Sequence, residues 1–261
     1  MYVLSPIQRT IILLQKAAGR NLLLSGAPGS GKTQFAYCMA AELGADIIRY
    51  DCRPDKERDM LYDFDVSGII KRTGAYVKGA IWRAFEASHS GRVVVLLDEV
   101  DKSNKSMDAF LLRILEECAF DSPDGDIIEG NRDNLIFVLT SNGRREIRPE
   151  VLRRTQRFRF ELPEGEIHRT IVATMTAAPN SMVSLACRVA ESMRKGDDSE
   201  LWASPKEVAS LCSDLMLLPN RDKATIAAIV TSYMVKSADA NVKRDTGFDA
   251  ILAFASEMAK L

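Results

Sequence analysis

The sequence predicts an α/β protein: a three-layer core, in which helices cover a parallel sheet, followed by a small all-helical domain. The first indication is the segment Gly26–Thr33, Gly-Ala-Pro-Gly-Ser-Gly-Lys-Thr, which lies between the apolar run Leu22–Leu24 and an apolar-periodic stretch. Two five-residue apolar runs, Val93–Leu97 and Leu135–Leu139, are typical of strands buried on both faces. After Pro163 such runs disappear and helical periodicity continues to the end of the chain.

Composition limits the class of protein. Lys and Arg total 35 against 36 Asp and Glu, so no global charge draws the chain onto nucleic acid or a membrane. The 5 cysteines lack any C-x-x-C pair, which indicates buried thiols in a reducing compartment. No apolar run of about 18 residues and no signal-peptide pattern is present. We therefore expect a cytoplasmic protein without membrane contact.

The first elements follow from capping and periodicity. A helix is expected to begin at Ser5-Pro6, where serine caps and proline takes the first position, and to end at Gly19. The strand and helix around the glycine segment come next, followed by a strand over Ile47–Tyr50. We expect the charged stretch Asp51–Asp65 to be a solvated connection and a helix to run from about Lys78 through Ala87.

The glycine segment fits the P-loop pattern G-x-x-x-x-G-K-[ST] at every fixed position. Glycines let successive N–H groups face inward, and the helix N-terminus adds its positive dipole end. Lys32 can reach the outer phosphates of a nucleotide, and the Thr33 hydroxyl can ligate Mg²⁺. A turn that binds nothing is the alternative, which the flanking strand and helix disfavour. We predict that the nucleotide is held by Gly26, Ala27, Pro28, Gly29, Ser30, Gly31, Lys32, Thr33 and Gln34.

Asp98 and Glu99 directly follow the strand Val93–Leu97. Ligand sites of parallel sheets lie at the carboxyl ends of the strands. One carboxylate can hold the magnesium shell, and the next can orient and deprotonate an attacking water. Acids at this place often only cap the next helix, but the upstream P-loop favours the catalytic interpretation. We predict Thr33 and Asp98 as metal-site residues and Glu99 as the general base.

The next segment carries a polar amide. A helix is expected over 107–117, and the turn-rich stretch 121–132 is expected to form a small projecting hairpin or loop. The strand Leu135–Leu139 is followed by Thr140-Ser141-Asn142. Asn142-Gly143 could be only a hairpin turn, although the polar, arginine-rich sequence after it weakens that interpretation. The Asn142 amide could instead position water against the terminal phosphate.

Arginines are dense between 144 and 159 and are opposed only by Glu146 and Glu150. Three interpretations stay open for them. They could form a solvated basic face, contact a nucleic-acid backbone, or reach a phosphate on a neighbouring subunit. The arginines are Arg144, Arg145, Arg148, Arg153, Arg154, Arg157 and Arg159.

The last hundred residues read as separate helices with polar breaks, so we predict an α/β core over 1–163 and a helical domain over 164–261. One of these helices opens with Ser204-Pro205, a cap followed by proline. Lys206 falls in its first turn.

The order of these motifs resembles that of the AAA+ ATPases. The stretches Cys52–Asp55, Asp59–Asp65 and Gly74–Gly79 look like those of the MoxR-type and dynein-related small ATPases within that superfamily. The resemblance implies Lys32 and Thr33 as Walker A, Asp98 and Glu99 as Walker B, and Asn142 as sensor 1. Arg154 and Arg157 match the R-x-x-R spacing of paired arginine fingers, with Arg153 as a competitor.

The same resemblance implies further roles. The helical domain would be the AAA+ lid, and Lys206 would stand where such proteins carry an arginine called sensor 2. Lysine keeps the charge but loses the bidentate geometry, and a surface lysine is the alternative. Tyr76 would be either an aromatic pore-loop residue or an ordinary packed aromatic. The site would be completed between protomers of a homo-oligomeric ring, usually a hexamer.

The resulting prediction is an ATP-hydrolysing, chaperone-like protein of the MoxR-like kind that uses ATP and Mg²⁺ to remodel or assemble a partner protein. A partner with a von Willebrand factor A domain is implied by family analogy alone. One alternative is a DNA-handling AAA+ ATPase such as a helicase loader or replication factor, which the near-neutral charge disfavours. The other is a nucleotide-gated assembly switch with little turnover.

Overall fold

The structure is a computed structural model of the 261-residue chain, and it describes residues 3–65, 76–194, 202–218, 222–234 and 248–258. The chain forms two compact units. One contains residues 4–26 and 31–160, and the other contains 161–261 together with 1–3 and 27–30. We call them the sheet unit and the helical unit. The predicted domain boundary after residue 163 stays a prediction.

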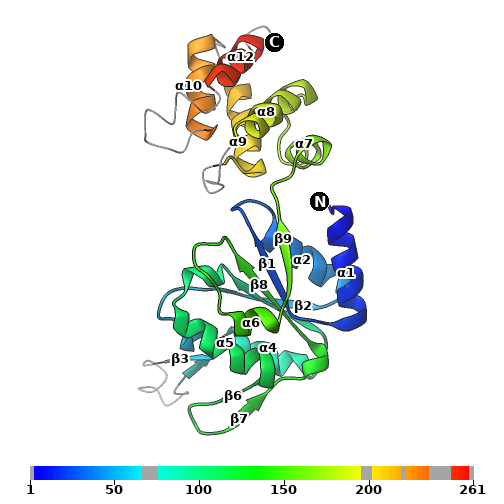
Figure 1. The fold of residues 1–261 in the computed structure, drawn as a ribbon, viewed down its shortest axis with the longest axis vertical. Helices are drawn as coiled ribbons and strands as arrows, with labels where there is room; N and C mark the ends of the chain where they lie inside the picture. The colour runs from blue at the N-terminus through cyan, green and yellow to red at the C-terminus, as the bar shows by residue number, and fades with distance from the viewer. Residues whose placement is uncertain (1–2, 66–75, 195–201, 219–221, 235–247, 259–261) are drawn as a thin grey trace. The chain divides into compact units, whose positions relative to one another are not determined.

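A five-stranded parallel sheet forms the centre of the sheet unit, as predicted (Figure 1). Its strand order is β2-β5-β8-β1-β9, and every pairing is parallel. The two fully apolar runs lie in the middle of this order, where β5 and β8 are buried at every residue. The strands are β1 (Leu22–Gly26), β2 (Asp46–Asp51), β5 (Val93–Asp98), β8 (Leu135–Ser141) and β9 (Gln156–Phe160).

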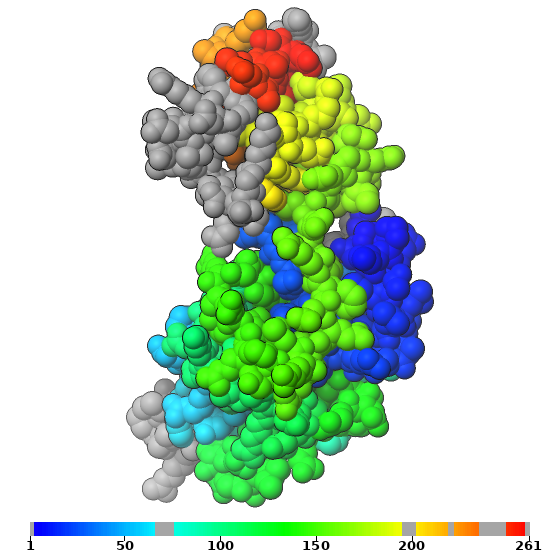
Figure 2. All heavy atoms as spheres, viewed as in Figure 1, coloured from blue at the N-terminus to red at the C-terminus, as the bar shows by residue number. Residues whose placement is uncertain are grey.

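Helices cover both faces of this sheet. Figure 1 shows α1 (Pro6–Ala18) and α2 (Lys32–Leu43) on one face, and α4 (Ala80–Ser88) and α5 (Lys105–Glu117) on the other. Because strand side chains alternate, Val93, Val95 and Leu97 join the core on the α4 side. The short helix α6 (Pro149–Arg153) leads into β9. Figure 2 shows α1, in blue, on the surface of this unit.

The start and stop signals of α1 are confirmed. Ser5 is its N-cap and forms a capping box with Gln8, Pro6 takes the first helical position, and Gly19 ends the helix in the left-handed conformation. A capping box satisfies two N–H groups that would otherwise lack partners at the helix start.

The prediction of a solvated connection over Asp51–Asp65 is wrong. This stretch contains a 3₁₀ turn, η1 (Arg58–Met60), and β3 (Tyr62–Phe64), which pairs antiparallel with β4 (Tyr76–Lys78). Charged residues dominate the sequence of this stretch, but its Met60 and Leu61 side chains are buried in the sheet-unit core. The helix expected from Lys78 begins at Ala80. In the region of the hairpin predicted over 121–132, β6 (Ala119–Asp121) pairs antiparallel with β7 (Ile127–Glu129). A 3₁₀ turn, η3 (Arg132–Asn134), follows this hairpin.

The helical unit has its own hydrophobic core. Its described helices are α7 (Gly165–Ala173), α8 (Asn180–Ser192), α9 (Pro205–Leu217), α10 (Lys223–Met234) and α12 (Phe248–Met258). The predicted cap of α9 is confirmed, since Ser204 forms a capping box with Glu207 and Pro205 follows it. Within the described ranges, no helix combines the length and the apolar character needed to span a bilayer.

A buried histidine in the helical unit makes a pH-dependent stability testable. His168 is fully buried, and its Nδ1 lies 2.8 Å from Oε1 of Glu191. Burial lowers the pKa of His168; Glu191 and Glu164 oppose this shift, and the nearby Arg194 adds to it. The unfolded chain therefore binds more protons than the folded one just below the ordinary histidine value of 6.5. The free energy of unfolding should then fall as the pH drops through this range.

The chain contains only 2 histidines, so the titration can be read directly by NMR. The imidazole signal that disappears in His168→Gln should titrate with a midpoint below 6.5. The variant should also lose the component of acid destabilisation that His168 contributes. A midpoint at or above the ordinary value would contradict the prediction.

Candidate functional site

The glycine segment leaves β1 at a point of close backbone approach. Gly26 has a φ of 146°, and a Cβ at this position would lie 1.9 Å from the carbonyl oxygen of Phe160 on β9. No residue with a side chain fits there without displacing the neighbouring backbone. The chain then reaches Gly31, which caps the start of α2, so the N-terminus of that helix faces the end of the glycine segment.

Lys32 is held at the carboxyl end of β1. Its Nζ donates a hydrogen bond to the carbonyl oxygen of Gly26 at 2.8 Å, and the side chain is buried. Burial lowers the pKa of Lys32 to about 8, partly opposed by the carboxylates of Asp101, Asp98 and Glu99. A poorly solvated ammonium group of this kind gains strongly from an arriving anion, because the anion replaces the lost hydration.

Asp98 is the centre of a hydrogen-bonded cluster at the ends of β5 and β8. The Thr33 hydroxyl donates to its two oxygens at 2.9 and 3.1 Å, and the Thr140 hydroxyl donates to Oδ1 at 2.5 Å. Nη2 of Arg49 lies 2.8 Å from Oδ2. The carboxylate itself is buried. The structure thus brings the two predicted metal-site residues into direct contact.

Thr33 and Asp98 fit a magnesium ion by the chemistry of their oxygen donors. Mg²⁺ prefers one or two carboxylate or hydroxyl ligands and completes its shell with water and substrate phosphates. No cluster of three or more His, Cys, Asp or Glu that could form a protein cage for a metal occurs in the described part of the chain. Arg49 meanwhile balances the buried charge of Asp98. These two residues would therefore share the ion with the phosphates.

The Glu99 side chain is fixed at both oxygens. Nδ2 of Asn142 donates to Oε1 at 2.9 Å, and Nζ of Lys102 forms an ion pair with Oε2. The backbone of Glu99 is left-handed, with a φ of 55°, and its N–H donates to the Thr140 hydroxyl at 2.8 Å. Strained backbone in a non-glycine residue persists where its surroundings hold it, and such residues cluster at functional sites. The predicted base and the predicted sensor asparagine are therefore hydrogen-bonded neighbours.

Sequence reasoning missed four residues of this cluster: Arg49, Asp101, Lys102 and Thr140. Asp101 accepts hydrogen bonds from the backbone N–H groups of Asn142 and Arg144 at 3.0 and 2.9 Å, which fixes the loop after β8. A signal was present for Thr140, since it lies at the end of the strand that precedes Asn142. No local pattern pointed to Arg49, which reaches Asp98 from the edge strand β2.

The arginines of the segment 144–159 differ in burial and in their hydrogen-bond partners. Arg145 is mostly buried and forms a bidentate pair with Asp108, with N···O distances of 2.7 and 2.9 Å. Arg154 donates to Glu116 Oε2 at 2.6 Å and to the Glu150 carbonyl at 2.9 Å. Arg153, on α6, and Arg157, on β9, are exposed. Arg145 thus differs from the exposed arginines, because its guanidinium group is mostly buried and is paired with a buried carboxylate.

The Arg145–Asp108 pair should matter for stability. Asp108 is 1% exposed, so Arg145→Met would leave an uncompensated charge in the interior. We expect a loss of about 3 to 5 kcal/mol in the free energy of unfolding, measured by urea denaturation. Arg113→Met is the matched control, because Arg113 pairs with Glu117 and Asp121 on the surface. Equal effects of the two substitutions would contradict the prediction.

Lys206 lies in the helical unit, exposed in the first turn of α9. The same compact unit contains residues 27–30. A Cβ at Gly29 would lie 2.4 Å from the Cβ of Ser204, the cap of α9. The cap of α9 and the tip of the glycine segment are therefore close neighbours, and the sensor 2 role of Lys206 stays a prediction.

Tyr76 packs in a row of aromatic side chains. Its ring stacks on Trp82 at 5.4 Å between centroids, and its hydroxyl donates to Asp124 at 2.5 Å. Among the two alternatives, this arrangement matches the packed aromatic. Gly74 and Ala75, which begin the stretch that resembles the MoxR-type ATPases, lie outside the described residues.

Several known proteins are similar to this chain over part or most of its length. Protein NorQ of Paracoccus denitrificans is 26% identical over 247 residues, which cover 90% of this chain and 87% of NorQ. The ClpA homolog protein of Fuscovulum blasticum is 29% identical over 125 residues, covering 47% of this chain but only 15% of that protein. The crystal structure of NtrX from Brucella abortus in complex with ADP has a TM-score of 0.55 at 14% identity, over 83% of this chain and 51% of NtrX. That last likeness shows a shared fold.

A family match covers the site itself. The sequence profile of the AAA domain, dynein-related subfamily, matches residues 21–160, which span β1 through β9 and thus the glycine segment, Asp98, Glu99 and Asn142. The match extends over more than half of the chain. The chain therefore belongs to the AAA domain family, dynein-related subfamily, and the resemblance to AAA+ ATPases inferred from its motifs is confirmed.

Proposed function

We propose that this protein hydrolyses ATP and uses the energy to remodel or assemble a partner protein. The observation that supports hydrolysis best is the contact between Glu99 and Asn142 beside the Thr33–Asp98 pair. The proposed base, the amide that would orient it and the proposed metal-binding pair all lie at one edge of the sheet. Phosphoryl transfer requires these components in this proximity.

In the proposed reaction, different residues of the chain bind the phosphates, hold the metal ion and accept the proton. The glycine segment and Lys32 bind and orient the phosphates, and Thr33 with Asp98 would hold Mg²⁺, which neutralises charge on the phosphate oxygens when bound. Glu99 accepts a proton from the attacking water, and Asn142 keeps its carboxylate in place. Because Lys102 pairs with Glu99 Oε2, this ion pair must loosen before that oxygen can accept the proton.

The ring is part of the same proposal. Arg154 and Arg157 of an adjoining copy would stabilise the charge that develops on the transferred phosphoryl group. Exposed positions on α6 and β9 support this for Arg153 and Arg157. Arg154 would exchange its pair with Glu116 for the neighbour's phosphate. We propose a hexamer, with sensor 2 supplied by Lys206.

Phosphate release tests the proposal directly. Purified protein with ATP and Mg²⁺ should release phosphate, and Lys32→Ala or removal of Mg²⁺ with a chelator should abolish release. Size-exclusion chromatography with ATP, ADP or no nucleotide should show a larger species with ATP. No release together with nucleotide-dependent assembly would point to the gated assembly switch, whereas no release and no assembly would refute both.

A further inference from the structure

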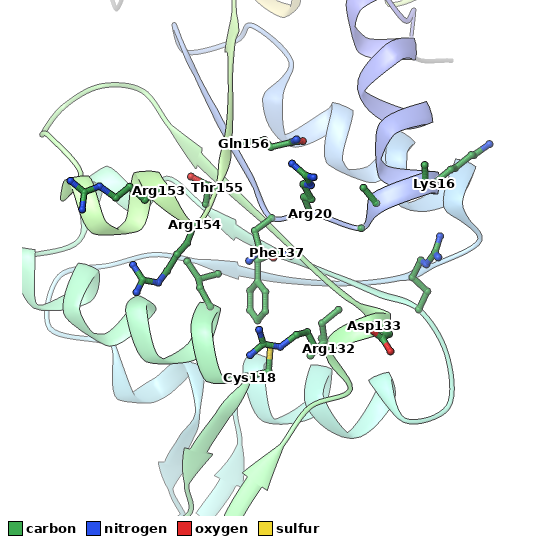
Figure 3. Close-up of a pocket in the computed structure, with 17 residues that line it drawn as sticks. Lys16, Arg20, Cys118, Arg132, Asp133, Phe137, Arg153, Arg154, Thr155 and Gln156 are labelled. Carbon is green, nitrogen blue, oxygen red and sulfur yellow. Dashed lines mark hydrogen bonds between the residues drawn. The ribbon is translucent and has the colours of Figure 1, made fainter.

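A basic cavity lies at the opposite edge of the sheet from the candidate nucleotide site. Its volume is about 680 Å³, and it collects residues from the end of α1, the starts of β8 and β9, and the turns that precede the strands (Figure 3). Six of its lining side chains are cationic and one is a carboxylate. The cations are Lys16, Arg20, Arg92, Arg132, Arg153 and Arg154, and the carboxylate is Asp133.

This excess of positive charge is local, because the whole chain has a formal net charge of −1. The six cations come from separate segments that only the fold brings together. Figure 3 shows the labelled Arg20, Arg132 and Arg154 reaching from three of these segments around Phe137. Like charges gathered around one hollow repel each other, and a concave wall concentrates their field on whatever enters. Such an arrangement favours a compact, multiply charged anion.

The arginines of the cavity differ in whether another described residue already binds their side chains. Arg154 pairs with Glu116, and Arg132 donates to the Glu116 carbonyl oxygen. By contrast, the side chains of Arg20, Arg92 and Arg153 form no hydrogen bond or ion pair with any described residue. Their donors are therefore free to bind a ligand without breaking a contact of the fold.

We propose that this cavity binds closely spaced phosphates, such as those of a polyphosphate chain or of a single nucleic-acid strand. A terminal phosphate carries about −1.5 to −2 charges and three acceptor oxygens. An inner phosphate carries a single charge, but in both kinds of chain the phosphates follow one another, so that several charges can enter the cavity together. The planar arginine fork matches phosphate oxygens in pairs. The cavity volume is also in the range of small-ligand sites.

The basic cavity is separate from the glycine segment of the same molecule. β1 and β8 begin at the cavity and end at the candidate nucleotide site. At about 3.3 Å per residue, the two places lie roughly 13 to 20 Å apart along these strands. A nucleotide bound by Lys32 cannot therefore supply the phosphates for the cavity of the same chain.

Calorimetric titration with tripolyphosphate tests this site in the full-length Lys32→Ala protein, in which binding through the glycine segment is removed. Tripolyphosphate should bind, and Arg20→Glu and Arg92→Glu should each weaken binding by about tenfold or more. The milder Arg20→Gln and Arg92→Gln should weaken it less, and they guard against misfolding. Arg9→Glu is the matched control, because Arg9 is exposed on α1 but does not line the cavity.

Competition separates the two sources of phosphate. A short oligothymidylate that displaces tripolyphosphate would assign the site to a nucleic-acid strand, and failure to displace it would assign the site to a free polyphosphate. Either result supports the proposal if the arginine variants lose binding. Equal binding by Arg20→Glu, Arg92→Glu and Arg9→Glu would overturn it, as would equally tight binding of polyglutamate.

Discussion

Glu99→Gln is expected to lower kcat for ATP hydrolysis by about two to four orders of magnitude. The substitution keeps the size of the side chain, and the amide oxygen can still accept the hydrogen bond from Asn142. It removes the negative charge and the basic lone pair that take the proton from water. Because phosphate binding depends on Lys32 and the glycine segment, ATP should still bind with similar affinity.

The measurement is steady-state phosphate release, combined with nucleotide binding to both proteins. Glu117→Gln, which neutralises an exposed glutamate at the end of α5, serves as the control and should turn over like the wild type. Lys102→Gln is informative in the same assay, since Lys102 pairs with the same carboxylate. If Glu99→Gln retains full turnover, Glu99 is not the base.

Arg154→Ala should lower kcat by about three to five orders of magnitude if Arg154 acts as an arginine finger. A fixed guanidinium group can raise kcat by this factor because it stabilises negative charge that develops only in the transition state. Binding of ATP to the altered chain's own site should change little. Arg157→Ala and Arg153→Ala, tested alongside, identify which of the three candidates carries the effect.

Mixing experiments decide whether the finger acts between copies. Arg154→Ala and Glu99→Gln chains should each be inactive alone. In mixed rings, some sites combine the intact Glu99 of an Arg154→Ala chain with the intact Arg154 of an adjoining Glu99→Gln chain. Part of the activity should therefore return. Glu116→Gln removes the resting partner of Arg154 and should leave turnover close to the wild-type value. No recovery on mixing, despite assembly, would contradict a shared site.

Tripolyphosphate binding and ATP hydrolysis test different parts of the molecule. The basic cavity includes Arg153 and Arg154, but its test relies on Arg20 and Arg92, which lie in neither the glycine segment nor the Asp98 cluster. A protein that hydrolyses ATP but ignores tripolyphosphate in the Lys32→Ala form would retain the proposed function and lose the proposed cavity site. A protein that binds tripolyphosphate in the Lys32→Ala form but does not hydrolyse ATP would retain the proposed cavity site and lose the proposed function.

The sequence predicted the parts that local patterns encode. Residues 22–33 form strand, glycine segment and helix because each depends on neighbours within a few positions: apolar side chains, glycine backbone freedom and a helix start. The carboxyl ends of parallel strands meet at one edge of a sheet. For that reason, residues after β5 and β8 could be expected together before the strand order was known. The prediction for the stretch 51–65 is wrong because charged residues outnumber its three buried side chains, Cys52, Met60 and Leu61.

Only the tertiary structure decided which side chains become partners across long separations in the chain. Arg49 reaches Asp98 because β2 pairs with β5, and Arg145 is buried because Asp108 on α5 accepts it. Nothing in the sequence around Arg49 or Arg145 marks either one as the partner of these carboxylates. The basic cavity likewise exists only where the ends of α1, α6 and the turns before the strands converge. Charge pairing depends on distance and desolvation, which strand order and packing set, and no local pattern records them.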